Sequence, residues 1–359
     1  MQGFTYEEVL SAQRTDKGRR YEKFVTNLKG LAQEKKNRAG EPLWHSKAVA
    51  PGSVHTNALL SNLSVMYAND EYIGEQLIPA VPVSKRSDVF AIYPKRERFA
   101  YPDDLIGSRS APNELNASRT TDNYSVKDYG LMDFVSQDTL DNQDAVFDEM
   151  MDLFENLNEG IAFKREKRLA TILTTTANFG SNTATLSGTD QWDHASGGDP
   201  IKRIQDGKAA LWQGRGPSDI VAYTSLEVLN VLARHNVIRD LFKYTGPDGL
   251  ATAQQIAGYF GFAKLLVGAS REDTANEGQT AAYSRIWGKH FGMVRVARRP
   301  SKRMAAFAAN FRLNGDPVTT QWFDQKPGKQ GGFYGKVGVS EDPKIIAADT
   351  GYLYANVIA

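Results

Sequence analysis

The most regular hydrophobic pattern in the chain lies between Asp144 and about Thr176, where apolar residues recur at steps of three and four. That spacing places them on one face of an α-helix. The apolar positions are Phe147, Met150, Phe154, Leu157, Ile161, Leu169 and Ile172. Acidic residues occupy the N-terminal half and basic residues the C-terminal half, so their charges interact favourably with the helix dipole. The pattern therefore predicts a single helix over 144–176, about 50 Å long, with an N-cap from the Asp/Asn-rich stretch 141–144.

Segments rich in β-branched and aromatic residues precede this helix. VFAIY at 89–93 and NYSVKDYGLMDFV at 123–135 are typical of strands. About thirty mostly polar residues separate them, and a loop of that length is uncommon inside a compact domain. We therefore expect a protruding hairpin that contacts another chain. Its candidate partners in ion pairs between subunits are Lys95, Arg96, Arg98, Asp103, Asp104 and Arg109.

Helices and strands alternate from about residue 200. The pattern predicts helices over 200–213, 225–242 and 252–260, and strands over 219–223, 264–267, 284–287 and 292–297. This alternation indicates a small α/β domain. Strand character returns in 304–313, 317–323 and 344–359. Because no helix accompanies this tail locally, we expect it to return to the long helix and to form one discontinuous domain with it.

The first 55 residues form a polar leader with helical patterns near 5–12 and 19–33. The second carries an apolar stripe consisting of Tyr21, Phe24, Val25, Leu28 and Leu31. Lys and Arg number ten in the first fifty residues against six acidic residues, a local excess of 10 − 6 = +4. Arg19, Arg20, Lys35 and Lys36 are the candidates for contact with DNA or with an acidic neighbour. A solvated helix with charged flanks explains the same pattern.

Composition narrows the function classes further. The chain has 359 residues, 43 Lys and Arg against 42 Asp and Glu, and 41% hydrophobic residues, so it has enough apolar material for well-packed cores. It has no cysteine, which excludes disulfides, thiolate nucleophiles and Cys-ligated metal sites. The start MQGFTYEEVL lacks the pattern of a secretory signal, and no apolar run approaches the roughly 18 residues of a membrane span. We expect a soluble, cytoplasmically made protein with no membrane partner.

The search for catalytic motifs finds no nucleophile elbow, P-loop or HExxH pair. Asp190, Asp193, His194 and Asp199 form the one cluster with metal-ligand chemistry. They lie in a Gly- and Ser-rich segment whose spacing does not match an EF-hand, so a solvated loop is the preferred interpretation. His235 lies in a predicted helix and is interpreted as a packing or surface residue. We assign no catalytic, metal-binding or cofactor-binding residue and no cofactor; a metal-dependent hydrolase using Asp190, Asp193 and His194 is the enzymatic alternative.

The order of elements resembles the tailed-phage major capsid protein with the HK97-type fold. LLSNLSVMYANDEYIGEQLIPAVPVSK at 59–85 is similar to the stretch that leads from the N-terminal arm into the extended loop. TDNYSVKDYGLMDFVSQDTLDN at 121–142 resembles the return strand of that loop. DIVAYTSLEVLNVLARHNVIRDLFKYTG at 219–246 resembles the axial-domain strand and helix, and DPKIIAADTGYLYANVI at 342–358 the terminal strands of the peripheral domain.

The resemblance implies an α+β, HK97-like capsid fold with a discontinuous peripheral domain and an inserted α/β axial domain. Its parts would be an N-terminal arm over 1–83, an extended β-hairpin loop over 84–135, and a peripheral domain over 136–199 that contains the spine helix 144–176. The axial domain would cover 200–297, and the peripheral β-tail 298–359.

The function implied is that of a structural, non-enzymatic capsid protein that assembles as pentamers and hexamers into an icosahedral shell around double-stranded DNA. Portal, scaffolding and decoration proteins are the expected further partners, and the virion capsid, assembled in the host cytoplasm, is the expected location. The alternative is an encapsulin-type nanocompartment shell, which shares the fold. Some family members cross-link through Lys and Asn; Lys95 and Asn356 supply these residue types, although no motif marks them.

Overall fold

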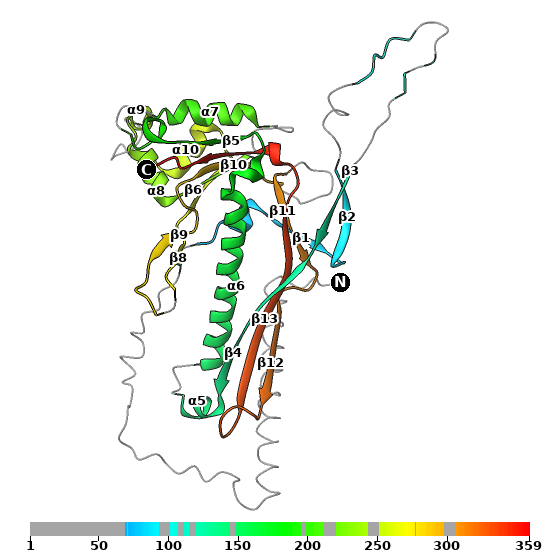
Figure 1. Ribbon diagram of the computed structural model, residues 1–359, viewed down its shortest axis with the longest axis vertical. Coiled ribbons are helices and arrows are strands. Elements are labelled where there is room, and N and C mark those ends of the chain that lie inside the picture. Colours follow the sequence, from blue (N-terminus) through cyan, green and yellow to red (C-terminus); the bar gives the residue numbers. More distant parts are fainter. Residues whose placement is uncertain are drawn as a thin grey trace, which may run out of the picture. The chain divides into compact units, whose positions relative to one another are not determined.

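The computed structural model of the chain divides into two compact units, Met1–Ser64 and Val65–Ala359, and every described residue belongs to the second (Figure 1). The described residues are 69, 71–92, 101–106, 111, 113–114, 120–143, 148–194, 198–211, 220–242, 251–276, 278–297 and 306–359. The predicted leader helices over 5–12 and 19–33 lie outside them. Among the described residues, no helix combines the length and apolar character that a membrane crossing requires.

The predicted long helix is present as α6 (Glu149–Thr174). It is shorter than the predicted 144–176. Asp148 is its N-cap, with the carboxylate accepting a hydrogen bond from the Met151 N–H at 3.1 Å. It ends because Thr175 is extended, with φ −82° and ψ 116°. Its buried apolar residues are Leu153, Leu157, Ile161, Leu169, Ala170 and Leu173.

A five-stranded sheet built around β13 (Gly332–Ile345) lies beside the helix (Figure 1). β4 (Lys127–Ser136) pairs along one edge of β13, while β12 (Val318–Asp324) and β11 (Ala308–Leu313) pair in succession along the other. β1 (Ala80–Val83) runs parallel to β11. Leu153, Leu157 and Ile161 of α6 form one apolar cluster with Val337 and Val339. The β-tail therefore returns to the long helix, as the sequence predicts.

The α/β segment forms a second five-stranded sheet with the order β5 (Thr183–Thr185), β14 (Gly351–Ala355), β10 (Phe291–Arg295), β6 (Ile220–Ser225) and β7 (Lys264–Gly268). Four helices accompany its strands in the described chain: α7 (Pro200–Ala210), α8 (Leu226–Arg234), α9 (Asn236–Phe242) and α10 (Ala253–Phe260). The last strand of the predicted β-tail over 298–359 pairs within this second sheet. β14 lies between β5 and β10, where the mostly buried sequence GYLYA suits the interior of a sheet.

Two predicted elements are each divided in the structure. The helix predicted over 225–242 is interrupted at His235, which is extended with ψ 130°. The strand predicted over 123–135 is two strands, β3 (Thr120–Ser125) and β4, on either side of buried Val126. The Val126 N–H donates to the Arg86 carbonyl at 2.8 Å, so the ladder partner changes at this residue.

The predicted hairpin is present as β2 (Ser87–Ile92) paired antiparallel with β3, from Ser87 opposite Ser125 to Ile92 opposite Thr120. A second small hairpin joins β8 (Arg271–Asp273) and β9 (Tyr283–Arg285). The remaining short elements are α3 (Gly74–Leu77), α5 (Gln137–Asn142), η1 (Thr176–Phe179), η2 (Gly188–Asp190) and η4 (Ala348–Thr350).

Candidate functional site

Of the hairpin residues predicted to form ion pairs between subunits, the structure describes Asp103 and Asp104, and both are exposed. The Asp103 carboxylate accepts a hydrogen bond from the Leu105 N–H at 3.1 Å, and the Asp103 carbonyl accepts one from Asn113 Nδ2 at 2.8 Å. These contacts order the stretch locally and leave the carboxylates facing solvent. The other candidates lie outside the described residues: Lys95, Arg96, Arg98, Arg109, Arg19, Arg20, Lys35 and Lys36.

The acidic residues considered as metal ligands have structural contacts instead. Asp199 caps α7 by accepting from the Lys202 N–H at 3.0 Å. Asp190 pairs with Arg203 at 3.1 Å, and Asp193 accepts from the N–H of the last residue, Ala359, at 2.9 Å. Within the part of the chain that the structure describes, no group of three or more His, Asp or Glu side chains is placed to hold a metal ion.

The base of the hairpin is fixed to the first sheet by aromatic and charged contacts. The Phe311 ring of β11 stacks on Tyr124 with centroids 4.7 Å apart and lies 5.5 Å from the Phe90 ring. Lys344 of β13 pairs with Asp122 at 2.8 Å. The Ser125 N–H donates to the Asp342 carboxylate, also of β13, at 2.9 Å. The hairpin therefore has a defined base, and β2 and β3 both contribute to it.

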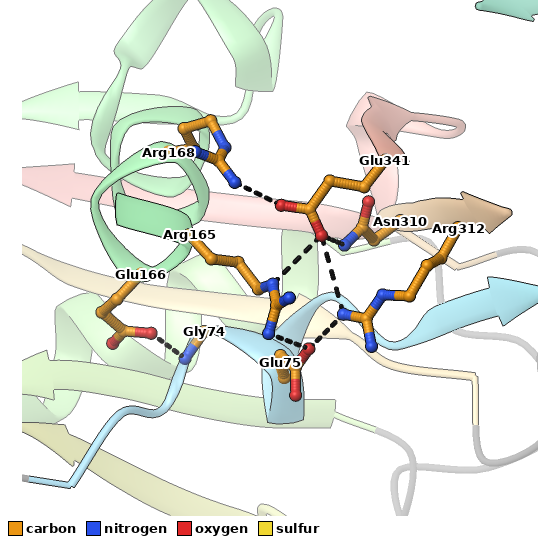
Figure 2. Close-up of polar contacts among 8 residues, drawn as sticks. All are labelled: Gly74, Glu75, Arg165, Glu166, Arg168, Asn310, Arg312 and Glu341. Carbon is orange, nitrogen blue, oxygen red and sulfur yellow. Dashed lines mark hydrogen bonds and ion pairs between the residues drawn. The ribbon is translucent and has the colours of Figure 1, made fainter. Parts of the chain in front are cut away.

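A buried carboxylate, Glu341 of β13, is the centre of a charged cluster between the sheet and α6 (Figure 2). Arg165 Nε and Arg168 Nη2 donate to its two oxygens at 3.0 and 2.5 Å. Asn310 Nδ2 donates at 3.0 Å, and an Arg312 nitrogen lies 3.6 Å away. Burial alone would raise the pKa of Glu341, but the hydrogen bonds from Arg168 and Asn310 and the charges of Arg165 and Arg168 outweigh it and hold the pKa low. We call these five side chains the Glu341 cluster.

Half-exposed Glu75 of α3 extends the cluster toward solvent. It lies 3.1 Å from Arg165 Nη1 and also pairs with Arg312. Two arginines of the Glu341 cluster are therefore shared between a buried and a partly hydrated carboxylate (Figure 2). This arrangement joins α3, α6, β11 and β13 through charge-assisted hydrogen bonds.

A second buried carboxylate, Glu166, points from α6 toward α3 and the second sheet. Its oxygens accept the N–H groups of Ile73 and Gly74 at 3.0 and 2.8 Å and the indole Nε1–H of Trp287 at 2.8 Å. Burial raises the pKa of Glu166, although these hydrogen bonds act in the opposite direction. A Cβ on Gly74 would lie 2.6 Å from a Glu166 oxygen, so glycine is needed for this approach.

The face of the first sheet that points away from α6 carries a row of aromatic side chains. The Trp322 ring of β12 stacks on Tyr334 of β13 at 5.3 Å, and Tyr334 lies 4.8 Å from Phe134 of β4. Trp322 and its neighbours Val318 and Met132 are 40%, 53% and 62% exposed. We call this surface the open sheet face. Exposed apolar area of this kind on a charged protein marks a surface suited to contact with another macromolecule.

The sequence analysis did not single out either buried carboxylate. Glu166 is an acidic residue within the basic half of the long helix, and this irregularity in the sequence could have indicated a buried carboxylate. Arg165 and Arg168 are three residues apart and therefore lie on one side of the helix, which also pointed to a shared partner. Glu341 lacked any such signal, because its partners are brought to it only by the return of the tail.

Comparison with known proteins places these features in context. The family described as phage capsid protein matches residues 119–353, more than half of the chain. The major capsid protein of Pseudomonas phage JBD67 is 28% identical over 308 residues, which cover 84% of this chain and 96% of that protein. A phage-related protein of Bordetella bronchiseptica has a similar crystal structure, with a TM-score of 0.62 and 19% identity over 80% of this chain and 92% of that one. The capsid protein of cyanophage P-SCSP1u gives a TM-score of 0.56 and 10% identity over 81% and 90% of the two chains.

Proposed function

This chain belongs to the phage capsid protein family, and from that membership we propose that it forms pentamers and hexamers that close into an icosahedral shell around double-stranded DNA. Its role is that of a structural component of the virion capsid, and its α+β fold is the HK97-like capsid fold. The observation that carries the proposal is the family match over 119–353, which spans the hairpin return strand, α6 and most of both sheets.

The non-enzymatic function is proposed from the family membership, and the buried charged groups of the described chain have structural contacts. The buried charged side chains of the Glu341 cluster and Glu166 are engaged with one another and with backbone groups across α3, α6 and the sheets. Removing one partner of such a contact would destabilise the subunit, so these side chains have a structural role. The encapsulin-type alternative is not favoured, because the relative that covers 84% of this chain is named a major capsid protein.

We assign the parts of the subunit within this proposal as follows. The hairpin built on β2 and β3 is the extended loop, and its charged residues, Asp103 and Asp104 among them, contact a neighbouring subunit. α6 and the sheet around β13 form the peripheral domain. The axial domain covers 200–297 together with the last strand, β14, since that strand pairs inside the second sheet.

The remaining partners are proposed from the same membership. The basic residues Arg19, Arg20, Lys35 and Lys36 contact packaged DNA or a neighbouring subunit, and neutralising all four distinguishes the two. If they contact DNA, genome retention weakens and its salt dependence becomes shallower, because fewer counterions are released. Portal, scaffolding and decoration proteins complete the particle, which we propose assembles in the host cytoplasm.

Negative-stain electron microscopy of the purified chain, with gel filtration, tests the proposal. Closed shells or capsomer rings are the expected result, and particles filled in the host should protect DNA from nuclease. A chain that stays a monomer or dimer even when scaffolding protein is supplied would contradict the proposal.

A further inference from the structure

A partly enclosed pocket lies beneath the base of the hairpin, where β2 and β3 meet the edge of the first sheet formed by β1 and β11. Its volume is about 220 Å³. That volume exceeds the roughly 150 Å³ of an apolar cavity that can hold benzene, and it lies below the range of roughly 300–1,000 Å³ that is typical of sites for drug-sized molecules. The pocket therefore has room for a molecule of one or two rings.

Aromatic rings fix the distance between the hairpin and the sheet, and alanines leave space beside them. The Phe311 ring of β11 contacts Tyr124 and Phe90 of the hairpin at centroid distances of 4.7 and 5.5 Å. Ala309 is two residues before Phe311, so both side chains point to the same face of β11. Ala309 and Ala306 both line the pocket, and both are buried. A larger apolar side chain at either position would occupy part of the space.

The charged side chains around the pocket are already paired with one another. Asp88, which lines the pocket, accepts a hydrogen bond from the following backbone N–H at 2.9 Å and lies 3.5 Å from Lys85. Lys344, whose Nζ lies 5.9 Å from the centroid of the Phe90 ring, pairs with Asp122 at 2.8 Å. Because these opposite charges balance, a charged ligand would lose its hydration without gaining a net attraction. The pocket therefore favours a neutral ligand.

The rest of the lining is apolar apart from two hydroxyl groups. These belong to Ser84 and Tyr124, and neither hydroxyl is buried without a hydrogen-bond partner. No buried side-chain donor or acceptor of the pocket therefore requires a polar ligand. Displacement of poorly ordered water by an apolar group is favourable, so an apolar ligand suits this site.

We propose that this pocket binds a neutral aromatic molecule of one or two rings. The rings of Phe90, Tyr124 and Phe311 favour an aromatic ligand over an aliphatic one, because offset and edge-to-face contacts between rings add to the energy of area burial. A ligand held between β2 and β11 contacts both the hairpin and the sheet, so its binding also strengthens the attachment of the hairpin. This inference goes beyond the proposed capsid function and does not depend on it.

Indole is a suitable probe, and its effect is measured by differential scanning calorimetry of the full chain below the concentration at which it assembles. At millimolar indole we expect the unfolding temperature to rise by about 2–4 °C and amide hydrogen exchange in β2 and β3 to slow. Uracil is also planar and neutral but much more polar, so it should change neither quantity. The absence of a rise with indole, or an equal rise with uracil, would overturn the proposal.

A variant that fills the pocket localises the effect. Ala309→Leu adds an isopropyl group inside the pocket and should abolish the response to indole. Ala210→Leu makes the same change at an exposed position on α7, outside the pocket, and should keep the wild-type response. If Ala309→Leu responds to indole as the wild type does, the pocket is not the binding site and the proposal is wrong.

Should Ala309→Leu not fold, methyl NMR of the wild-type chain decides the question. Indole should shift the methyl signals of Val81 and Val83, which line the pocket, and leave those of Val337 and Val339 in the cluster with α6 unchanged. Shifts of equal size in both pairs would show non-specific binding and overturn the proposal. None of these measurements involves assembly, so a negative result would leave the proposed capsid function standing.

Discussion

Replacing Glu341 with glutamine tests whether the Glu341 cluster stabilises the subunit. Glutamine keeps the shape of the side chain but removes its charge, which leaves Arg165, Arg168 and Arg312 around a neutral amide. Removing one partner of a buried ion pair typically costs about 3–5 kcal/mol. The three arginine side chains retain 14–23% exposure, and Glu75 still pairs with two of them, so we expect about 3 kcal/mol, near the lower limit.

Urea unfolding followed by tryptophan fluorescence measures this difference, with subunits kept below the concentration at which they assemble. Glu75→Gln is the matched control, because it makes the same chemical change next to Arg165 and Arg312 at a carboxylate that is 50% exposed. For this control we expect a loss of about 0–1 kcal/mol. If the two variants lose the same free energy of unfolding, burial is not what makes Glu341 important, and the reasoning is refuted.

Further predictions concern pH, the hairpin base, the helix start and α3. The folded pKa of Glu341 lies below its ordinary value of 4.5, so the stability that the ionised Glu341 gives the fold is complete above pH 4.5 and is lost as the pH falls through the folded pKa. The difference in free energy of unfolding between wild type and Glu341→Gln should therefore narrow below pH 4.5. A constant difference in urea titrations would contradict this. Phe311→Ala should lose about 3–5 kcal/mol and raise amide hydrogen exchange in β2 and β3, whereas unchanged exchange there would show that the stacking does not hold the hairpin. Asp148→Ala should cost about 1 kcal/mol through the lost N-cap of α6, with Asp148→Asn as the control that retains it. Gly74→Ala should cost about 1–3 kcal/mol through its clash with Glu166, visible as a lower melting temperature.

Local periodicity was sufficient to predict most of the secondary structure. The apolar steps of three and four placed α6 correctly, and the β-branched segment at 89–93 identified β2. The ends were less accurate, since a cap such as Asp148 competes with several nearby Asp and Asn residues for the same role. The break at His235 was missed because the sequence there retains helical spacing, and only tertiary contacts decide that the backbone turns.

The long-range pairings could not be read from local pattern. β14 follows the tail strands in sequence, yet it pairs with β10 and β5 in the other sheet. Likewise, half of β13 lies in the glycine-rich stretch 332–338, which is a weak strand signal because glycine is disfavoured in strands. These glycines differ in their surroundings: a Cβ on Gly335 would lie 2.2 Å from Leu153 of α6, whereas one on Gly338 would lie 3.7 Å from its nearest atom. A single sequence does not distinguish the two.

The position of α6 between both sheets bears on how the subunit can respond to forces in a shell. Its front half packs through Leu153 and Leu157 against the sheet around β13. Its back half packs through Leu169 and Leu173 in a cluster that includes strands of the second sheet.

Two consecutive polar residues of α6 also contact different parts of the fold. Arg165 turns to β13, whereas Glu166 turns to α3 and Trp287. The Leu173 carbonyl also accepts a hydrogen bond from the Tyr223 hydroxyl of β6 at 2.6 Å. Buried cores are closely packed and resist deformation. The proposed domain boundary at residue 199 therefore does not divide the subunit into parts that move independently. A displacement of either sheet can therefore reach the other through α6 and through the apolar cluster that also contains Ala308 of β11 and Val294 of β10.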